Sequence, residues 1–103
     1  MSSHLNPDQF ATYGDHVLVH DSEPGRGYDT ITAHPIDGYP ESYSGILETS
    51  HRTNEILNVG VMKKYERQGL ATAMLDFART KNPDIVHSEI LSDDGAAWAK
   101  AVP

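Results

Sequence analysis

The chain has 103 residues, which is enough for one domain with one hydrophobic core and excludes two domains. Its hydrophobic content of 38% is that of a globular protein, and its net charge of −7 disfavours nucleic acid and anionic lipid as main partners. The lack of cysteine excludes disulfides and thiolate chemistry and fits a reducing compartment. Because no apolar run could span a membrane, we expect a single cytoplasmic domain over residues 1–103 with no membrane partner.

The first half of the chain has strand character. Residues 1–14 are polar and show no sustained period, so we expect a loosely held arm attached through Phe10 and Tyr13. Four segments with strand composition follow, each bounded by turn residues. The links between them are too short for a crossover helix, which predicts an antiparallel meander. The predicted strands are residues 16–20, 28–33, 43–49 and 55–62.

Side chains alternate in the fourth of these segments. Ile56 and Asn58 point to one face of the predicted strand, whereas Leu57, Val59 and Val61 point to the other. One face of this strand is therefore apolar.

After Gly69 the apolar residues change to helical spacing, and this pattern stops at Asn82-Pro83. The sequence therefore predicts a helix between these points. Its apolar positions are Leu70, Ala71, Met74, Leu75 and Ala78.

The last part of the chain predicts one more strand and one more helix. Residues 84–87 form a short apolar strand, and residues 92–102 form a helix with Ser92 or Asp93 at its N-cap. A strand, a crossover helix and a strand make a βαβ unit with parallel strands. We thus predict an α+β (α/β) fold: a mixed, mainly antiparallel sheet of about five strands, with a βαβ unit and two helices.

The junction between the fourth strand and the first helix has the composition of a phosphate site. The first turn of a helix carries unpaired N–H groups and a partial positive charge, and Gly69 lets an anion approach the backbone without a Cβ in the way. Lys63, Lys64 and Arg67 add three positive charges within five residues of an otherwise acidic chain. The alternatives are a loop glycine beside a solvated lysine face, and a site for a nucleotide or dinucleotide.

The segment from Glu55 to Leu75 runs from a valine-containing strand through an aromatic residue, a glycine and a small residue into an apolar helix. This order resembles the central motif of the GNAT superfamily of acyl-coenzyme A N-acyltransferases. A weaker match runs through Val86 to the pattern Ser92-x-x-Gly95-x-x-Trp98. The two matches cover residues 55–102, while residues 16–49 agree with the family only in the number and order of strands.

The resemblance implies a GNAT-like fold in which the fourth and fifth strands splay apart and leave a slot for the cofactor. It implies acetyl-coenzyme A (acetyl-CoA) as acyl donor, with its pyrophosphate on the N–H groups of the turn and its pantetheine arm along the backbone of Val61. The cofactor-binding residues that it implies are Val59, Val61, Lys63, Arg67, Gln68, Gly69, Leu70, Ala71, Thr72 and Ser92.

Three positions depart from the family pattern. Glu66 places an acid beside an expected polyanion, where the family usually has glutamine or arginine. Ser92 occupies an asparagine position, and Ala99 stands where a tyrosine often protonates the departing thiolate. These departures support an alternative function, in which a weak or inactive GNAT-like domain acts as a module that binds acyl-CoA or a protein.

Acyl transfer to an amine needs a base for the amine and a donor for the departing thiolate. Glu55 lies fourteen residues before Gly69, the spacing of the general base in histone-acetylating members of the family. The alternative is a solvent-facing strand carboxylate opposite Arg52 or a lysine. His87 is the second candidate, with a hydrogen-bonded structural histidine as its alternative, and Ser88 could donate to a thioester oxygen or simply end the strand.

The six histidines raise the question of a metal. His16 and His20 share one face of a predicted strand but lie about 13 Å apart along it, too far to share an ion. His34, His51 and His87 lie in separate segments with no ligand spacing among them. We therefore predict no metal site.

Together these features predict an N-acetyltransferase that moves an acetyl group from acetyl-CoA to a primary amine. The link over residues 21–28 is too short for the helices that normally form a wall of the acceptor site in the family, so we expect an open groove. Such a groove suits a protein lysine or N-terminus, or is completed by a second subunit in a homodimer. A nucleic-acid modifying relative is a third interpretation, favoured by the basic cluster and disfavoured by the net charge.

Overall fold

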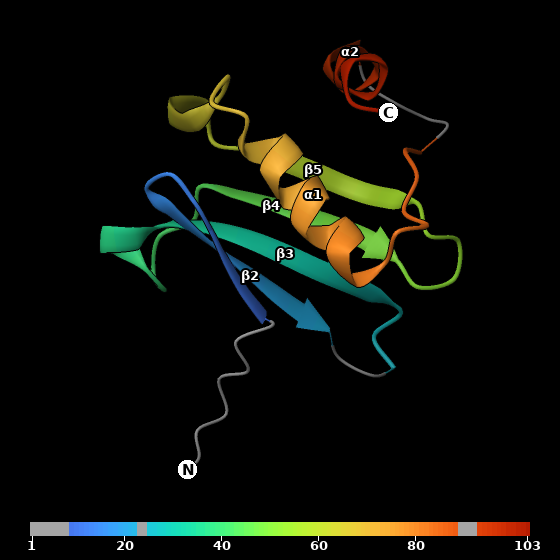
Figure 1. Cartoon of the computed structure of the whole chain (residues 1–103), viewed down its shortest axis with the longest axis horizontal. Coiled ribbons are helices and arrows are strands. Elements are labelled where there is room, and N and C mark those ends of the chain that lie inside the picture. Colours follow the sequence, from blue (N-terminus) through green and yellow to red (C-terminus); the bar gives the residue numbers. More distant parts are fainter. Residues whose placement is uncertain (1–8, 23–24, 89–92) are drawn as a thin grey trace.

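Five strands form one antiparallel sheet in the order β1-β2-β3-β4-β5, and two helices follow along the chain (Figure 1). The computed structural model describes residues 9–22, 25–88 and 93–103. The predicted α+β class is confirmed at this level. The elements are β1 (Phe10–Tyr13), β2 (His16–Ser22), β3 (Tyr28–Pro35), η2 (Ile36–Gly38), β4 (Gly45–Ser50), β5 (Ile56–Val61), η3 (Lys63–Tyr65), α1 (Leu70–Lys81) and α2 (Asp93–Ala101), where η marks a 3-10 helix.

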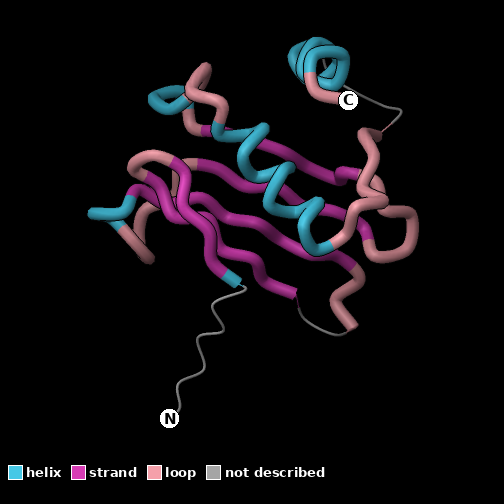
Figure 2. The backbone as a smooth tube through the Cα atoms, viewed as in Figure 1, coloured by secondary structure: helices cyan, strands magenta, loops and turns pink. Residues whose placement is uncertain are grey.

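The helix α1 crosses one face of the sheet, as Figure 2 shows. Its buried side chains are four of the five apolar positions predicted from the sequence, so the helical period is confirmed. The sheet meets them with large side chains from adjacent strands, each at most 2% exposed. Burial of one such side chain contributes roughly 1.5–3 kcal/mol. The core contacts join Leu70, Met74, Leu75 and Ala78 of α1 to Leu18, Ile31 and Leu47 of the sheet.

The prediction of a loosely held arm over residues 1–14 is wrong for residues 10–13. They form β1 and pair with β2 across a tight turn, with Phe10 opposite Val19 and Tyr13 opposite His16. The turn contains Gly14 in the left-handed region (φ 57°), which fixes the register of the hairpin. Residues 1–8 lie outside the described part of the chain.

The predicted alternation in β5 is wrong at its first two residues. The pairing of β4 with β5 shifts at Glu48/Thr49, and this irregularity places Ile56 opposite Thr49 on the buried face. Ile56 is 6% exposed, whereas Leu57 is 58% exposed. Beyond the shift the predicted pattern holds, because Val59 packs against the core.

The predicted strand over residues 84–87 is reduced to a single bridge. Glu55 and Val86 form one parallel pair, so the predicted direction is correct but no strand extends from it. The turn at Pro83 and Asp84 precedes the bridge, and His87 directly after it hydrogen-bonds the C-terminal segment. The sheet is therefore antiparallel throughout its five strands, and the predicted mixed sheet with a full βαβ unit is not formed by the described residues.

The second helix is confirmed over residues 93–101, one residue shorter at each end than predicted. Its predicted cap at Ser92 lies outside the described residues. Figure 1 shows α2 beyond the β5 edge of the sheet. Neither helix in the described ranges is long and apolar enough to cross a membrane.

Candidate functional site

The turn between β5 and α1 contains two residues in the left-handed region. After η3 the backbone passes through Glu66, and Arg67 (φ 65°) and Gly69 (φ 79°) then take left-handed conformations on either side of Gln68. Glycine adopts this conformation without steric cost. Alternation of left-handed and ordinary residues turns successive N–H groups toward a common side, which is how backbone nests bind anions.

Tyr13 of β1 holds this turn in place. Its hydroxyl donates a hydrogen bond to the Gln68 carbonyl oxygen. A Cβ atom added to Gly69 would lie 2.5 Å from the same hydroxyl oxygen, so a side chain at this position would displace Tyr13. Residues 1–14 carry no sustained sequence pattern, so nothing in the sequence indicates this role of Tyr13.

The start of α1 has N–H groups without acceptors. Gly69 is the N-cap and provides no side-chain hydrogen bond. Ala73 donates to the Gly69 carbonyl at 2.9 Å and is the first helical N–H with a partner. The N–H groups of Leu70, Ala71 and Thr72 have no acceptor among the described residues. With the partial positive charge of the helix start, they are suited to bind a phosphate group.

A cavity of about 440 Å³ opens beside these N–H groups, and we call it the α1 cavity. It lies between the end of β5, the turn, the first turn of α1, and Trp98 of α2. Six of the ten predicted cofactor-binding residues line it and are therefore brought together by the fold. They are Val61, Arg67, Gly69, Leu70, Ala71 and Thr72.

The other four predicted cofactor-binding residues do not line the α1 cavity. Val59 packs against the core, and Lys63 is exposed on η3. Gln68 lines a different cavity, on the far side of the turn. Ser92 lies outside the described residues.

Trp98 closes the α1 cavity from the side of α2. Its indole Nε1 donates to Thr72 Oγ1 at 3.1 Å, and its ring packs edge-to-face on His87 with 4.8 Å between the ring centroids. His87 Nε2 donates to the Val102 carbonyl at 2.6 Å. These contacts fix α2 beside the start of α1. The sequence showed an aromatic residue on the last helix but gave no signal of its hydrogen bond to Thr72.

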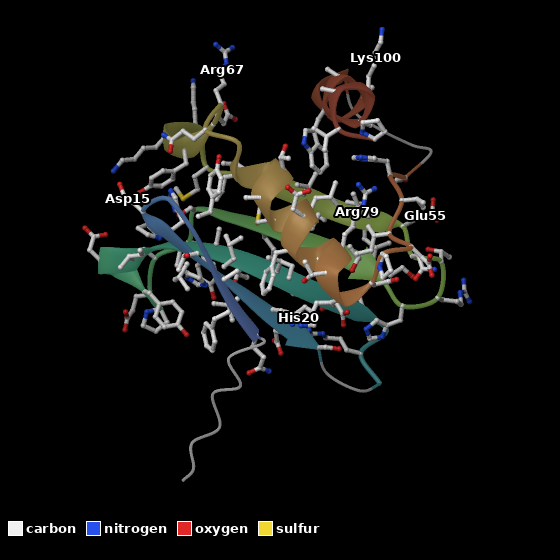
Figure 3. The ribbon with its side chains drawn as sticks, viewed as in Figure 1. Asp15, His20, Glu55, Arg67, Arg79 and Lys100 are labelled. Carbon is white, nitrogen blue, oxygen red and sulfur yellow. The ribbon has the colours of Figure 1, made fainter. Side chains whose placement is uncertain are left out.

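The three predicted catalytic residues do not line the α1 cavity. Glu55 forms the bridge to Val86 at the far end of β5, six residues and roughly 20 Å along the strand from Val61. Figure 3 shows Glu55 and Arg67 at opposite ends of this region. His87 fits the alternative of a hydrogen-bonded structural histidine, because its Nε2 donates to the Val102 carbonyl. Ser88 follows His87 and is half-buried.

The outer edge of β5 is open along most of its length. β5 ends the sheet and pairs with β4 on one side. On the other side, Ile56 N–H donates to the Val86 carbonyl and Val86 N–H to the Asn54 carbonyl, both at 2.9 Å. Residues 57–61 have no strand partner on that edge within the described ranges. An extended chain can therefore add to β5 as a further strand.

The charged side chains around the turn are exposed and have no ion-pair partner in the described part of the chain. Lys64 Nζ lies 5.5 Å from the Tyr65 ring centroid, and Figure 3 shows the Arg67 side chain extending outward from the turn. Glu66 lines the α1 cavity itself, so its carboxylate would repel an anionic ligand there, as predicted from the sequence. Arg67 is a cation that lines the same cavity.

A second cluster of titratable side chains joins β2, β3 and the turn after β4. His20 Nε2 and His51 Nε2 lie 3.4 Å and 2.5 Å from the two carboxylate oxygens of Asp29. Burial raises the pKa of Asp29, but hydrogen bonds from Ser22, His51 and His20 outweigh it and hold this pKa below its ordinary value of 3.8. Among the described residues, no three His, Asp or Glu side chains are arranged to hold a metal ion.

Comparison of the chain with protein-family models, curated proteins and solved structures found no match. The fold and the α1 cavity alone therefore define the class: an α+β domain in which a left-handed glycine and a helix start form a cavity suited to an anionic group.

Proposed function

We propose that this chain is a minimal GNAT-like acyltransferase that transfers an acetyl group from acetyl-CoA to a primary amine. The observation that carries the proposal is the α1 cavity, where Leu70, Ala71 and Thr72 present N–H groups without acceptors next to left-handed Gly69. The order of strand, turn and helix is the one that the resemblance to the family implies. The cavity also collects most of the residues that the resemblance assigned to the cofactor.

The residues present fit the two ends of such a cofactor. The N–H groups of the helix start and Arg67 would bind its pyrophosphate. Val61 lines the α1 cavity and is also the last residue of the open β5 edge, so an extended arm can continue from the cavity along this strand. Trp98 lines the cavity from the side of α2. When bound, acetyl-CoA would supply the activated acyl group as a thioester.

Glu55 is the proposed base for the amine. It lies at the end of the open β5 edge, in the direction in which the arm would extend from Val61. The carboxylate would accept the proton that the amine loses. The acceptor side is open, because β2 ends at Ser22 and β3 begins at Tyr28, with too few residues between them for a helical wall. This supports a protein lysine or N-terminus as the acceptor.

A module that binds acyl-CoA without catalysis is the second candidate. The observation in its favour is the small number of groups available for proton transfer. His87 is held by the Val102 carbonyl, and Ala99 occupies the position where the family often has its tyrosine. Within the described residues, neither position then provides a proton donor for the departing thiolate.

Calorimetric titration with acetyl-CoA tests the binding of this cofactor in the α1 cavity, which both candidate functions require. We expect micromolar binding to the wild-type protein and at least tenfold weaker binding to Ala71→Phe, whose side chain would fill the α1 cavity. Thr80→Phe is the matched control, because Thr80 is exposed near the other end of the same helix. No binding at millimolar acetyl-CoA, or equal binding to Ala71→Phe and Thr80→Phe, would refute the proposed site.

An assay of thiol release separates the two candidates. If the chain is an acetyltransferase, it should turn over acetyl-CoA with a lysine-containing peptide as acceptor, and the rate should fall at least tenfold in Glu55→Gln. The binding module predicts no turnover above the uncatalysed rate although acetyl-CoA binds. Equal rates for the wild type and Glu55→Gln would remove Glu55 from the mechanism.

A further inference from the structure

A second cavity, of about 880 Å³, lies on the other side of the turn between β5 and α1. It is bordered by the β1–β2 hairpin, by η2 and by η3, and we call it the hairpin cavity. Ile36 N–H donates to the Asp15 carbonyl at 2.8 Å, which joins the two loops that carry Asp15 and Asp37. Both aspartates, His16 and Tyr65 line this cavity.

His16 is the buried polar group of the hairpin cavity. It is 5% exposed, and its Nδ1 lies 2.9 Å from Ser44 Oγ. Ser44 is fully buried, and its hydroxyl has no other partner among the described residues. Donation from this hydroxyl to Nδ1 satisfies both groups and places a ring proton on Nε2.

The Nε2–H group of His16 has no acceptor among the described residues. The other buried histidine, His34, differs in this respect, because Thr32 Oγ1 and the Ser42 carbonyl lie 2.9 Å from its two ring nitrogens. Buried donors in proteins are almost always paired. The His16 ring packs edge-to-face on Tyr65, with 4.9 Å between the ring centroids, and His16 lines the hairpin cavity, so its Nε2–H can serve an acceptor atom of a bound ligand.

The rim of the hairpin cavity is acidic and aromatic. Asp15 and Asp37 are exposed and form no ion pair within the described part of the chain. Lys64 is the cation that lines the cavity, and its Nζ lies over the Tyr65 ring at 5.5 Å from the centroid. Two carboxylates in a cavity that is also lined by Tyr13 and Tyr65 favour a ligand with a positive charge.

We propose that the hairpin cavity binds a small α-amino carbonyl compound, of the size of an amino-acid amide. Its ammonium group lies between the Asp15 and Asp37 carboxylates, and its carbonyl oxygen accepts the hydrogen bond from His16 Nε2. This inference does not rest on the proposed acetyltransferase function. Glu55, the proposed base, lies at the other end of the sheet, so the hairpin cavity is separate from the reaction centre proposed above.

Titration of the 15N-labelled protein with glycinamide, followed by NMR, tests this site. We expect chemical-shift changes centred on residues 14–16 and 36–37. Ethylamine lacks the carbonyl group and N-acetylglycinamide lacks the ammonium group, so each should bind at least about threefold more weakly. Equal binding of ethylamine and glycinamide, or changes centred on residues 70–72, would overturn the proposal.

Two sets of variants assign the contacts. Asp15→Asn combined with Asp37→Asn should weaken glycinamide binding roughly fivefold or more, whereas Asp76→Asn, an exposed carboxylate on α1, should leave it unchanged. His16→Phe keeps an aromatic ring against Tyr65 and removes the donor, so the preference for glycinamide over ethylamine should disappear. If His16→Phe does not fold, the aspartate variants still decide, because unchanged binding in the double variant overturns the proposal.

The proposals for the α1 cavity and the hairpin cavity can be tested separately. Ala71→Phe, which fills the α1 cavity, should leave glycinamide binding unchanged. Loss of glycinamide binding in this variant, in a protein that remains folded, would show that the hairpin cavity is not a separate site and would contradict the inference.

Discussion

Gly69 meets two structural requirements that a methyl group would violate. Its φ of 79° costs a non-glycine residue roughly 1–2 kcal/mol. A Cβ would also lie 2.5 Å from the Tyr13 hydroxyl, which must then move and lose its hydrogen bond to the Gln68 carbonyl, a loss of about 0.5–1.5 kcal/mol. Gly69→Ala should therefore lower the free energy of unfolding by about 2–3 kcal/mol, measured by urea denaturation with circular dichroism.

Gly27→Ala is the matched control. Gly27 has a φ of 88°, and an added Cβ would meet no atom within 4 Å. This variant should therefore lose only the backbone contribution of roughly 1–2 kcal/mol. The difference between the two glycine variants measures the contact with Tyr13.

Tyr13→Phe completes a double-mutant cycle with Gly69→Ala. In the wild type it removes the hydrogen bond to Gln68 and should cost about 1 kcal/mol. In the Gly69→Ala background that bond is already lost and the contact is relieved, so the second substitution should cost nearly nothing. Equal losses for Gly69→Ala and Gly27→Ala, with additive effects of Tyr13→Phe, would refute the reasoning.

Three further predictions follow from the site and the core. Glu66→Gln removes a carboxylate from the α1 cavity and should therefore tighten acetyl-CoA binding roughly two- to fivefold. Glu41 is exposed, and Glu41→Gln should leave the affinity unchanged. Equal affinities of these two variants for acetyl-CoA in calorimetry would contradict this prediction. Trp98→Phe removes the hydrogen bond to Thr72 and should lower the free energy of unfolding by about 1 kcal/mol in urea; an unchanged midpoint would show that this bond does not hold α2. Asp29 has a lowered pKa, so its contribution to stability is complete above its ordinary value of 3.8 and is lost as the pH falls through the folded-state value. Asp29→Asn should remove the loss of stability that protonation of Asp29 causes in the acid-unfolding curve. An acid-unfolding curve of unchanged shape would contradict this role of Asp29.

The elements that the sequence predicted well are those decided by local periodicity. The apolar residues of α1 recur at helical spacing, and Asn82 and Pro83 end the pattern where the helix ends. The central strands also follow their composition, and β3 and β4 differ from prediction only at their ends. The turn at Gly69 could be assigned as a helix start because a glycine before an apolar period is itself a local signal.

The elements that the sequence missed depend on contacts between distant residues. β1 has only four residues, and its place in the structure is fixed by pairing with β2 and by the hydrogen bond from Tyr13 to Gln68, which lies 55 residues away. The shift that exposes Leu57 arises from the register with β4, which no pattern within β5 reveals. The strand predicted over residues 84–87 is wrong, because Val86 pairs with Glu55 through a single bridge that no local pattern indicates.

The residues of the candidate site also divide into those that local sequence indicates and those that only the fold brings together. The anion-suited part of the α1 cavity is a turn and one helix end, so the sequence could indicate it. The prediction of Glu55 depends on a spacing within the family, whereas that of His87 depends on a histidine at the end of a predicted strand. The structure leaves Glu55 at the end of an open strand edge and uses His87 to hold Val102. The hairpin cavity gave no signal, because His16 and Asp37 come together only through the pairing of β2 with β3.

The open edge of β5 connects the fold to the proposed function. An unpaired edge exposes backbone N–H and C=O groups, and here Leu57 and Val86 beside it are 58% and 49% exposed. If a pantetheine arm adds to this edge, it forms hydrogen bonds that a pyrophosphate alone cannot form. Adenosine 3′-phosphate 5′-diphosphate, which lacks the arm, should therefore bind at least about tenfold more weakly than coenzyme A, as two net hydrogen bonds would give. Equal affinities in calorimetry would show that the β5 edge makes no contribution and that the α1 cavity alone binds the ligand.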